Sequence, residues 1–243
     1  MKPINIEVIY EDEDILVVNK PSGCLVLPDR IKSEDWNIKA HFEKQYPNIF
    51  IVHRIDRDTS GVLILAKNAA AHKHLSLQFQ ERKTAKNYIA LVHGRMQVKA
   101  ATLTLKIAEN KAHRGRYLIH KSGLDAITHY QTIEEFRHYT LLDIQIETGR
   151  THQIRVHMQA IQHPLAIDPI YGLPEKTGIF LSEIKKHYKP NKEVEEERPL
   201  INRLTLHASK LTITHPTTNE VMILEADLPK DFQLVLKHLR SNK

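Results

Sequence analysis

The amino-acid sequence predicts an α+β protein with a mixed, mostly antiparallel central sheet that is flanked by helices and loops. Segments with the alternating or continuous apolar pattern of strands outnumber segments with helical spacing. Strands and helices do not alternate regularly, as they would in a doubly wound parallel sheet. Short polar turns join several of the strand segments, which is typical of antiparallel pairs. At 243 residues, we expect one domain over residues 1–243.

The N-terminal third contains the clearest local signals. Residues 6–19 predict a hairpin, because two apolar strands are separated by the polar turn 11–14. A short amphipathic helix is expected within residues 36–46, with Trp36, Ala40 and Phe42 facing inward.

A second set of signals follows immediately. The continuous apolar run Val62–Ala66 predicts a strand that is buried on both faces. Asn68 is a suitable N-cap for a helix over residues 69–79, since its side chain can accept a hydrogen bond from the first helical turn.

The remaining elements are predicted from weaker periodicities. A helix is expected to begin near Thr151 and to place Ile154, Met158 and Ile161 on one face. Asp231–Leu239 predicts a C-terminal helix, and His215–Asn219 a turn. Further strands are expected at residues 88–92, 102–107, 141–147, 204–206, 211–213 and 221–224.

The segment 176–199 differs in composition from the rest of the chain. It is rich in Lys and Glu, and we expect a charged insertion that is partly ordered. Leu181, Ile184 and Tyr188 have the spacing of a narrow helical stripe, although a solvated surface loop explains the same composition.

Composition and charge exclude several classes of protein. The apolar and charged fractions, 41% and 26%, are those of a globular protein, not a disordered one. A single cysteine, Cys24, permits no intramolecular disulfide, which fits a reducing compartment. No apolar run approaches a membrane span, and the N-terminus lacks the pattern of a signal peptide. We therefore expect a cytoplasmic protein, and its net charge of +6 favours anionic partners.

Known cofactor motifs are missing from the sequence. It has no glycine-rich phosphate loop, no zinc-ligand spacing, and no Gly-x-Ser-x-Gly elbow around Ser60. Two polar clusters border predicted strands instead, His53–Gly61 and Thr148–Arg155. Charged groups beside core strands are costly to desolvate unless they pair, and the clusters contain both arginine and aspartate. Turn-capping aspartates and structural salt bridges would account for the same residues.

Five motifs in order, spread over nearly the whole chain, resemble the RluA-type pseudouridine synthase family. The motif His53-Arg54-Ile55-Asp56 with Thr59-Ser60-Gly61 is similar to the signature of that family. The other four are Glu11–Gly23, Lys86–Gly94, Thr148–His157, and Arg203–Ala208 with His215-Pro216. This resemblance implies the pseudouridine synthase fold and an RNA-modifying isomerase that uses no metal and no organic cofactor.

The resemblance also implies roles for particular residues. Asp56 would be the catalytic aspartate, Tyr88 would stack on the target base or remove its C5 proton, and Arg150 would pair with Asp56. Arg54 would hold the flipped nucleotide or fill the space that it leaves. The other residues implied in substrate binding are His53, Thr59, Lys86 and Arg155. We also expect contacts between RNA phosphates and Lys83, Lys86, Arg114 and Arg116.

Two departures from the family pattern bear on these expectations. Ile55 stands where leucine is usual, and the segment 162–168 lacks the glycine that usually precedes Asp168. The first motif begins almost at Met1, so we expect no separate N-terminal RNA-binding module.

The expected partner is ribosomal or transfer RNA, bound by a monomer that does not associate with membranes. Two alternatives are an RNA-binding homologue without activity and a carboxylate-dependent hydrolase of nucleosides or glycosides.

Overall fold

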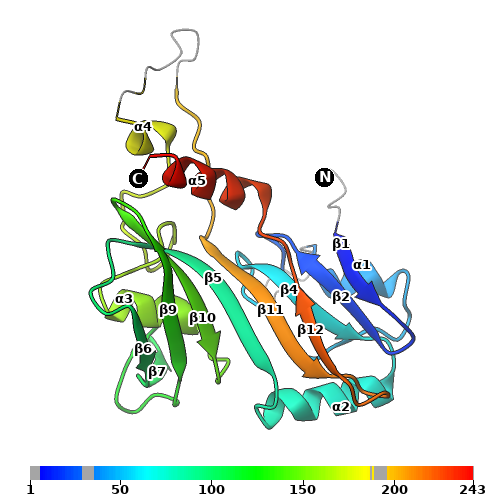
Figure 1. Ribbon diagram of the computed structural model, residues 1–243. Helices are drawn as coiled ribbons and strands as arrows, with labels where there is room; N and C mark the ends of the chain where they lie inside the picture. The colour runs from blue at the N-terminus through cyan, green and yellow to red at the C-terminus, as the bar shows by residue number, and fades with distance from the viewer. Residues whose placement is uncertain (1–5, 29–35, 187, 189–195, 243) are drawn as a thin grey trace. The chain divides into compact units, whose positions relative to one another are not determined.

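The computed structural model describes residues 6–28, 36–186, 188 and 196–242 of the chain (Figure 1). Contacts between Cα atoms group the chain into two compact units. Unit 1 contains residues 1–88, 145–147 and 207–227, and unit 2 contains residues 89–144, 148–206 and 228–243. The expectation of one domain remains a prediction.

Unit 1 is built on a sheet whose strands pair in the order β1-β2-β4-β11. Strand β12 pairs with β11, and β3 pairs with β4. The bounds of the strands are β1 Glu7–Glu11, β2 Ile15–Lys20, β3 Phe50–Ile51, β4 Ser60–Ala66, β11 Leu206–Thr214 and β12 Val221–Glu225. All these pairs are antiparallel except β4 with β11, which are parallel at His207 and Ala208.

Strand β4 forms the centre of unit 1. All seven of its residues are buried, as the continuous apolar run predicts. Two apolar clusters cover its two faces: one contains Ile64 and Leu75 of helix α2, and the other contains Leu65 and Phe42 of helix α1.

Helix α2 spans Ala69–Gln80 and begins at the predicted cap, because the side chain of Asn68 accepts a hydrogen bond from the Ala71 main chain at 2.8 Å. Helix α1 is shorter than predicted, Ile38–Glu43. The prediction that Ala40 faces inward is wrong: Ala40 is exposed, and the buried pair is Ile38 and Phe42. These larger side chains, four residues apart, define the apolar face.

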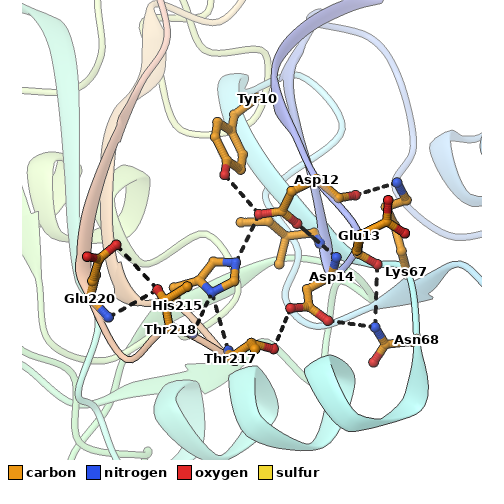
Figure 2. Close-up of polar contacts among 11 residues, drawn as sticks. Tyr10, Asp12, Glu13, Asp14, Lys67, Asn68, His215, Thr217, Thr218 and Glu220 are labelled. Atoms are coloured by element: carbon orange, nitrogen blue, oxygen red, sulfur yellow. Dashed lines mark hydrogen bonds and ion pairs between the residues drawn. The ribbon is translucent and has the colours of Figure 1, made fainter.

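A polar network joins two turns of unit 1 (Figure 2). Asp12, in the turn between β1 and β2, accepts hydrogen bonds from the Tyr10 hydroxyl and from Nε2 of His215, both at 2.9 Å. Nδ1 of His215 accepts from the main-chain N–H groups of Thr217 and Thr218, at 3.2 and 3.1 Å. His215 therefore links the β1–β2 turn to the β11–β12 turn, where the sequence predicts only a turn.

In unit 2 the strand order is β5-β10-β9-β6, and β7 and β8 form a separate two-stranded sheet. Strands β5 and β10 each begin or end among the residues of unit 1. The bounds are β5 Ala85–His93, β6 Ala100–Leu103, β7 Ile107–Glu109, β8 Tyr117–Ile119, β9 Thr128–Glu135 and β10 Tyr139–Ile146. The expected strand at 102–107 is broken, because β6 ends at Leu103 and β7 begins at Ile107.

Three helices lie among the described residues of unit 2: α3 Gln153–Ala160, α4 Leu181–Ile184 and α5 Lys230–Arg240. The principal core of this unit gathers Phe136, Leu141, Ile179, Phe232 and Leu236. Within the segment 176–199, α4 confirms part of the predicted helical stripe, whereas residues 187 and 189–195 lie outside the described residues. These elements confirm the predicted α+β class and its mostly antiparallel pairing. Within the described ranges, no helix is long and apolar enough to cross a membrane.

Candidate active site

The loop that carries Asp56 leads directly into the buried strand β4. The main-chain N–H of Thr59 donates to the Asp56 carbonyl at 3.1 Å, which closes the turn 56–59. Thr59 is buried, while Asp56 is half-buried. The turn therefore fixes the main chain on both sides of the Asp56 side chain without covering that side chain completely.

Lys20 holds this loop from the end of β2. Its side chain is 0% exposed, so its ammonium must be satisfied by protein groups. The ammonium donates to the main-chain oxygens of Pro21 at 2.9 Å, Cys24 at 2.9 Å and Arg57 at 2.8 Å. One buried cation thereby joins the segment after β2 to the residue that follows Asp56.

Two further hydrogen bonds connect the same segments. The hydroxyl of Ser22 donates to the Asp58 carbonyl at 2.6 Å, and the main-chain N–H of Gly23 donates to the Arg57 carbonyl at 2.9 Å. The motif Lys20-Pro21-Ser22-Gly23 is thus a support for the Asp56 loop.

Strand β11 supports the loop at its other end. Oγ of Ser60 lies 2.9 Å from Nδ1 of His207, and both residues are fully buried. Nε2 of His207 lies 3.0 Å from the Ala226 carbonyl. Since a carbonyl only accepts, Nε2 carries the proton and Nδ1 accepts from the Ser60 hydroxyl.

Gly61 permits the close approach of β4 and β11. Its φ is +118°, and an added Cβ would lie 2.1 Å from the carbonyl oxygen of Ala208. No other residue type fits both the backbone conformation and the space, which explains the glycine in the Asp56 motif.

His53 is placed as a neutral, packed residue. Its ring stacks on that of Phe79 at a centroid distance of 4.6 Å, and its Nε2 accepts from the main-chain N–H of Ile64 at 3.2 Å. Burial, and then the charge of Lys86, lowers the pKa of His53 to about 3. The geometry agrees with this value, because a protonated imidazole could not accept the hydrogen bond from Ile64.

Tyr88 and Lys86 lie on strand β5 and belong to unit 1, like Asp56. Burial, and then the charge of Asp56, raises the pKa of the Tyr88 hydroxyl. The Asp56 carboxylate is therefore close enough to Tyr88 to act on it electrostatically. Burial, and then the charge of Arg82, lowers the pKa of Lys86, whose ammonium donates to the Glu147 carbonyl at 3.3 Å.

The Arg150 loop, in unit 2, is organised by the buried side chain of Gln153. Oε1 of Gln153 accepts from the Thr148 hydroxyl at 2.8 Å and from the Arg150 main chain at 3.0 Å. Nε2 of Gln153 donates to the Ile127 carbonyl at 2.9 Å. The Arg150 side chain donates through Nε to the Asp125 carbonyl at 3.0 Å. This loop is therefore held in place before helix α3 begins.

Arg155 lies inside unit 2. Its guanidinium makes a bidentate ion pair with Asp168, with two N–O distances of 2.7 Å, and the two side chains are 2% and 1% exposed. Asp168 also accepts from the main-chain N–H groups of Ile170 and Tyr171, at 2.9 and 3.0 Å. This burial argues against the predicted contact between Arg155 and substrate, and makes the pair a support for the segment 162–171.

Six of the predicted site residues lie in unit 1: His53, Arg54, Asp56, Thr59, Lys86 and Tyr88. Arg150 and Arg155 lie in unit 2, so the pairing of Asp56 with Arg150 remains a prediction. Lys20, Gln153 and His207 are not among the site residues that the sequence predicts. Two of them left a signal in the sequence: Lys20 directly follows an apolar strand, and His207 lies within one.

Comparisons with known proteins point to one family. Residues 14–160 match the sequence model of the family described as RNA pseudouridylate synthase. An uncharacterized RNA pseudouridine synthase of Bacillus subtilis is 37% identical over 99% of this chain and 75% of its own length. The ribosomal large subunit pseudouridine synthase D of Buchnera aphidicola is 36% identical over 96% of this chain and 73% of its own length. The protein of the same name from Escherichia coli is 34% identical over 98% of this chain and 72% of its own length.

Solved structures give the same result. The structure of human RNA pseudouridylate synthase domain containing 1 is similar with a TM-score of 0.69 and 26% identity, over 99% of this chain and 98% of that one. Human RNA pseudouridylate synthase domain containing 4 has a similar fold, with a TM-score of 0.72 and 21% identity, over 96% and 93% of the two chains. The resemblance seen in the sequence is confirmed: this chain belongs to the RNA pseudouridylate synthase family, which makes it an RNA-modifying isomerase.

Proposed function

We propose that the protein converts uridines of large-subunit ribosomal RNA to pseudouridine, with Asp56 as the catalytic carboxylate. The observation that carries this proposal is the Asp56 loop, which Lys20, Ser22 and Gly23 hold from one side and His207 from the other, with Tyr88 in electrostatic reach of the carboxylate. Relatives that are named for ribosomal RNA of the large subunit support that target over transfer RNA. The protein would act as a monomer in the cytoplasm.

The reaction is an isomerisation, so the atoms of substrate and product balance. The N1–C1′ bond breaks, the freed uracil rotates, and a C5–C1′ bond forms. The C5 proton leaves to solvent, and N1 takes up a proton. Asp56 would act at the sugar, either by adding to C1′ or by removing the C2′ proton to give a glycal, as carboxylates do in other glycosyl chemistry.

Tyr88 would stack on the target base in its neutral form. An aromatic ring offers an apolar face of the size of the base, and its hydroxyl offers a polar edge. Because the pKa of Tyr88 is raised, its phenolate is not the resting form at neutral pH. If Tyr88 removes the C5 proton, its own proton must leave within the same step, so stacking is the better supported role.

The remaining residues would bind the flipped nucleotide and its phosphates. Arg54 is exposed at the start of the loop, where its planar guanidinium suits a phosphate or the gap that the flipped base leaves. Lys86 would contact a phosphate, and Thr59 would shape the floor of the site. Arg150 would pair with the Asp56 carboxylate and fix its direction. His53 would support the loop through its contacts with Phe79 and Ile64.

The direct test is to map pseudouridines in ribosomal and transfer RNA of cells that lack this gene. Rescue strains would carry the natural protein, Asp56→Ala, or the matched control Asp58→Asn, which changes a carboxylate two residues away. We expect one or more ribosomal positions to be lost on deletion and restored by the natural protein and by Asp58→Asn, but not by Asp56→Ala.

Purified protein distinguishes the alternatives. A transcript labelled with tritium at C5 of uridine should release tritium without releasing free uracil, and Asp56→Ala should slow this release by about a thousandfold or more. Free uracil would indicate a hydrolase. No tritium release by the natural protein on ribosomal and transfer RNA would indicate a homologue that binds RNA without activity.

A further inference from the structure

The two-stranded sheet of unit 2 carries an unusual concentration of positive charge. Strands β7 (Ile107–Glu109) and β8 (Tyr117–Ile119) pair in antiparallel register and enclose the turn 110–116. We call residues 106–121 the basic hairpin. It contains five cationic side chains, Lys106, Lys111, Arg114, Arg116 and Lys121, and one carboxylate, Glu109. Its net charge is therefore +4, whereas the complete chain has a net charge of +6.

Four of the five cations have no acidic partner among the residues that the structure describes. Some lysines outside the basic hairpin do pair with carboxylates, as in Lys39–Glu43 at 2.8 Å and Lys210–Glu225 at 2.8 Å. Lys111, Arg114, Arg116 and Lys121 are all exposed, and none of them makes an ion pair with any described residue. Lys106 has one partner, Asp125, at 3.3 Å. The basic hairpin is therefore distinguished by the concentration of five cations against one carboxylate within residues 106–121.

The base of the basic hairpin is anchored in unit 2. The main-chain N–H of Tyr117 donates to the Tyr171 hydroxyl at 2.8 Å. Ile107 is buried in a cluster with Val156 of helix α3 and Tyr171. Gly123 lies against the main chain of Ile107, where an added Cβ would be 2.5 Å from the carbonyl carbon. The strands are therefore fixed before any partner binds.

The turn of the basic hairpin is also ordered by its own hydrogen bonds. The main-chain N–H of Asn110 donates to the Arg116 carbonyl at 2.8 Å, and that of Arg116 donates to the His113 carbonyl at 3.0 Å. Gly115, with a φ of +78°, allows the chain to turn between the two arginines. Arg114 and Arg116 are thus presented from a defined backbone, which lowers the entropy lost when they bind.

We propose that the basic hairpin binds the sugar–phosphate backbone of RNA outside the flipped nucleotide. The choice of RNA as the anion rests on the function proposed above. Guanidinium groups match phosphate oxygens bidentately, and lysines add point charges. Contacts of this kind raise affinity without reading sequence, and they release counterions. The basic hairpin thereby contributes to binding of the RNA and not to the chemical step.

The test compares two variants that remove the same charge. The first is Lys111→Gln/Arg114→Gln/Arg116→Gln/Lys121→Gln. The control is Lys44→Gln/Lys73→Gln/Lys230→Gln/Lys237→Gln, four exposed lysines outside the basic hairpin whose loss lowers the net charge equally. The probe is an unmodified transcript of large-subunit ribosomal RNA. Its dissociation constant is measured at salt concentrations from about 50 to about 300 mM, a range that includes physiological ionic strength.

The hairpin variant should show a weaker dependence of affinity on salt. Four contacts to phosphates of single-stranded RNA would contribute about 2.8 to the magnitude of the slope of log K against log salt. We expect the magnitude of this slope to decrease by at least about 2 in the hairpin variant and by less than about 1 in the control. Tritium release at saturating RNA should remain within about twofold of the natural protein, since only binding is altered.

Equal slopes and equal affinities for the two variants would overturn the proposal. Loss of turnover at saturating RNA would also contradict it, because the basic hairpin would then act in the chemical step. The binding measurement does not require catalysis, so an inactive natural protein would refute the proposed function while leaving this comparison valid. If the fourfold variant does not fold, Arg114→Glu changes one exposed side chain and should still lower the slope relative to Lys44→Glu.

Discussion

The ammonium of Lys20 lies 2.8 Å from the main-chain oxygen of Arg57, the residue that follows Asp56. Lys20 therefore acts on the candidate active site without being exposed at it. A substitution of Lys20 therefore tests the support of the loop without changing the Asp56 carboxylate itself.

Replacing Lys20 by methionine should lower both stability and activity. The substitution keeps the length of the side chain but leaves three carbonyl oxygens without their charged donor. We expect the free energy of unfolding to fall by about 2–4 kcal/mol, as measured by urea denaturation. The control is Lys39→Met, on the surface of helix α1, which should cost about 0.5 kcal/mol or less. An unchanged unfolding free energy in Lys20→Met would contradict the role of the buried ammonium.

Gly61→Ala should be among the most damaging substitutions of a small residue in this chain. The new Cβ would meet the Ala208 carbonyl at 2.1 Å, in a backbone conformation that alanine rarely adopts. We expect a loss of about 3 kcal/mol or more in unfolding free energy. Gly149→Ala is the matched control, because nothing lies within 4 Å of its added Cβ. Comparable melting temperatures for the two variants would show that β4 and β11 can separate easily.

His53 should make the protein sensitive to acid. Its pKa falls from about 6.5 in the unfolded chain to about 3 in the folded protein. The unfolded state therefore binds more protons below pH 6.5, and stability decreases as the pH falls from 6.5 towards 3. Between pH 7 and pH 5 this one group should cost about 2 kcal/mol.

The measurement is guanidinium denaturation of the natural protein and of His53→Gln at both pH values. The variant should lose about 2 kcal/mol less than the natural protein over this interval, and the exposed His113→Gln should behave like the natural protein. Parallel losses in all three would mean that His53 is protonated at little cost in the folded state.

Tyr88 should support catalysis as a phenol. Since burial and the charge of Asp56 raise its pKa, the fraction of phenolate stays small between pH 7 and pH 9. A single-turnover rate that depended on preformed phenolate would increase about tenfold per pH unit in this range, whereas we expect a nearly flat profile. Tyr88→Phe should retain most substrate binding, and Tyr88→Leu should weaken it. A steep rise with pH that disappears in Tyr88→Phe would establish the phenolate as the base.

The Asp12–His215 pair should contribute to stability at a distance from the site (Figure 2). Burial by itself would raise the pKa of Asp12, but the main-chain N–H groups of Ile15 and Asp14 outweigh it, so the pKa is lowered. Its contribution is present above the unfolded pKa, near 4, and is lost as the pH falls through the lower folded value. At pH 7, Asp12→Ala should cost about 2 kcal/mol, while the exposed neighbour Glu13→Ala should cost much less; thermal unfolding of both variants measures the difference.

Local patterns in the sequence predict those elements whose stability is local. The run Val62–Ala66 and the cap at Asn68 were both confirmed, because burial on two faces and capping leave short-range signals. Strand β9 was not anticipated, since its Thr, His, Gln and Glu residues conceal an alternation in which Tyr130 is buried. The parallel pairing of β4 with β11 joins residues almost 150 positions apart, and no local pattern encodes it.

The same distinction applies to the site. Asp56 and Tyr88 were proposed as site residues from motifs in the sequence, and their roles remain predictions. The supports were not identified, because a buried lysine with three carbonyl partners cannot be told from an exposed lysine by its letter. Arg155 illustrates the opposite error: an arginine in a functional motif was expected at the substrate, and the structure pairs it with Asp168 in the interior.

Unit 1 is built from three separate stretches of the chain, and this affects when it can fold during translation. By the time the ribosome has added Ala160, the end of the family match, all the candidate catalytic residues have been translated. Strand β11, which pairs with β4 at Ser60 and Gly61, has not yet been translated at that point. Its residues His207 and Ala208 follow almost fifty residues later. In a nascent chain of that length, Asp56 would lie in a loop that lacks one of its two supports. Activity should therefore appear late in translation and abruptly, when β11 leaves the exit tunnel.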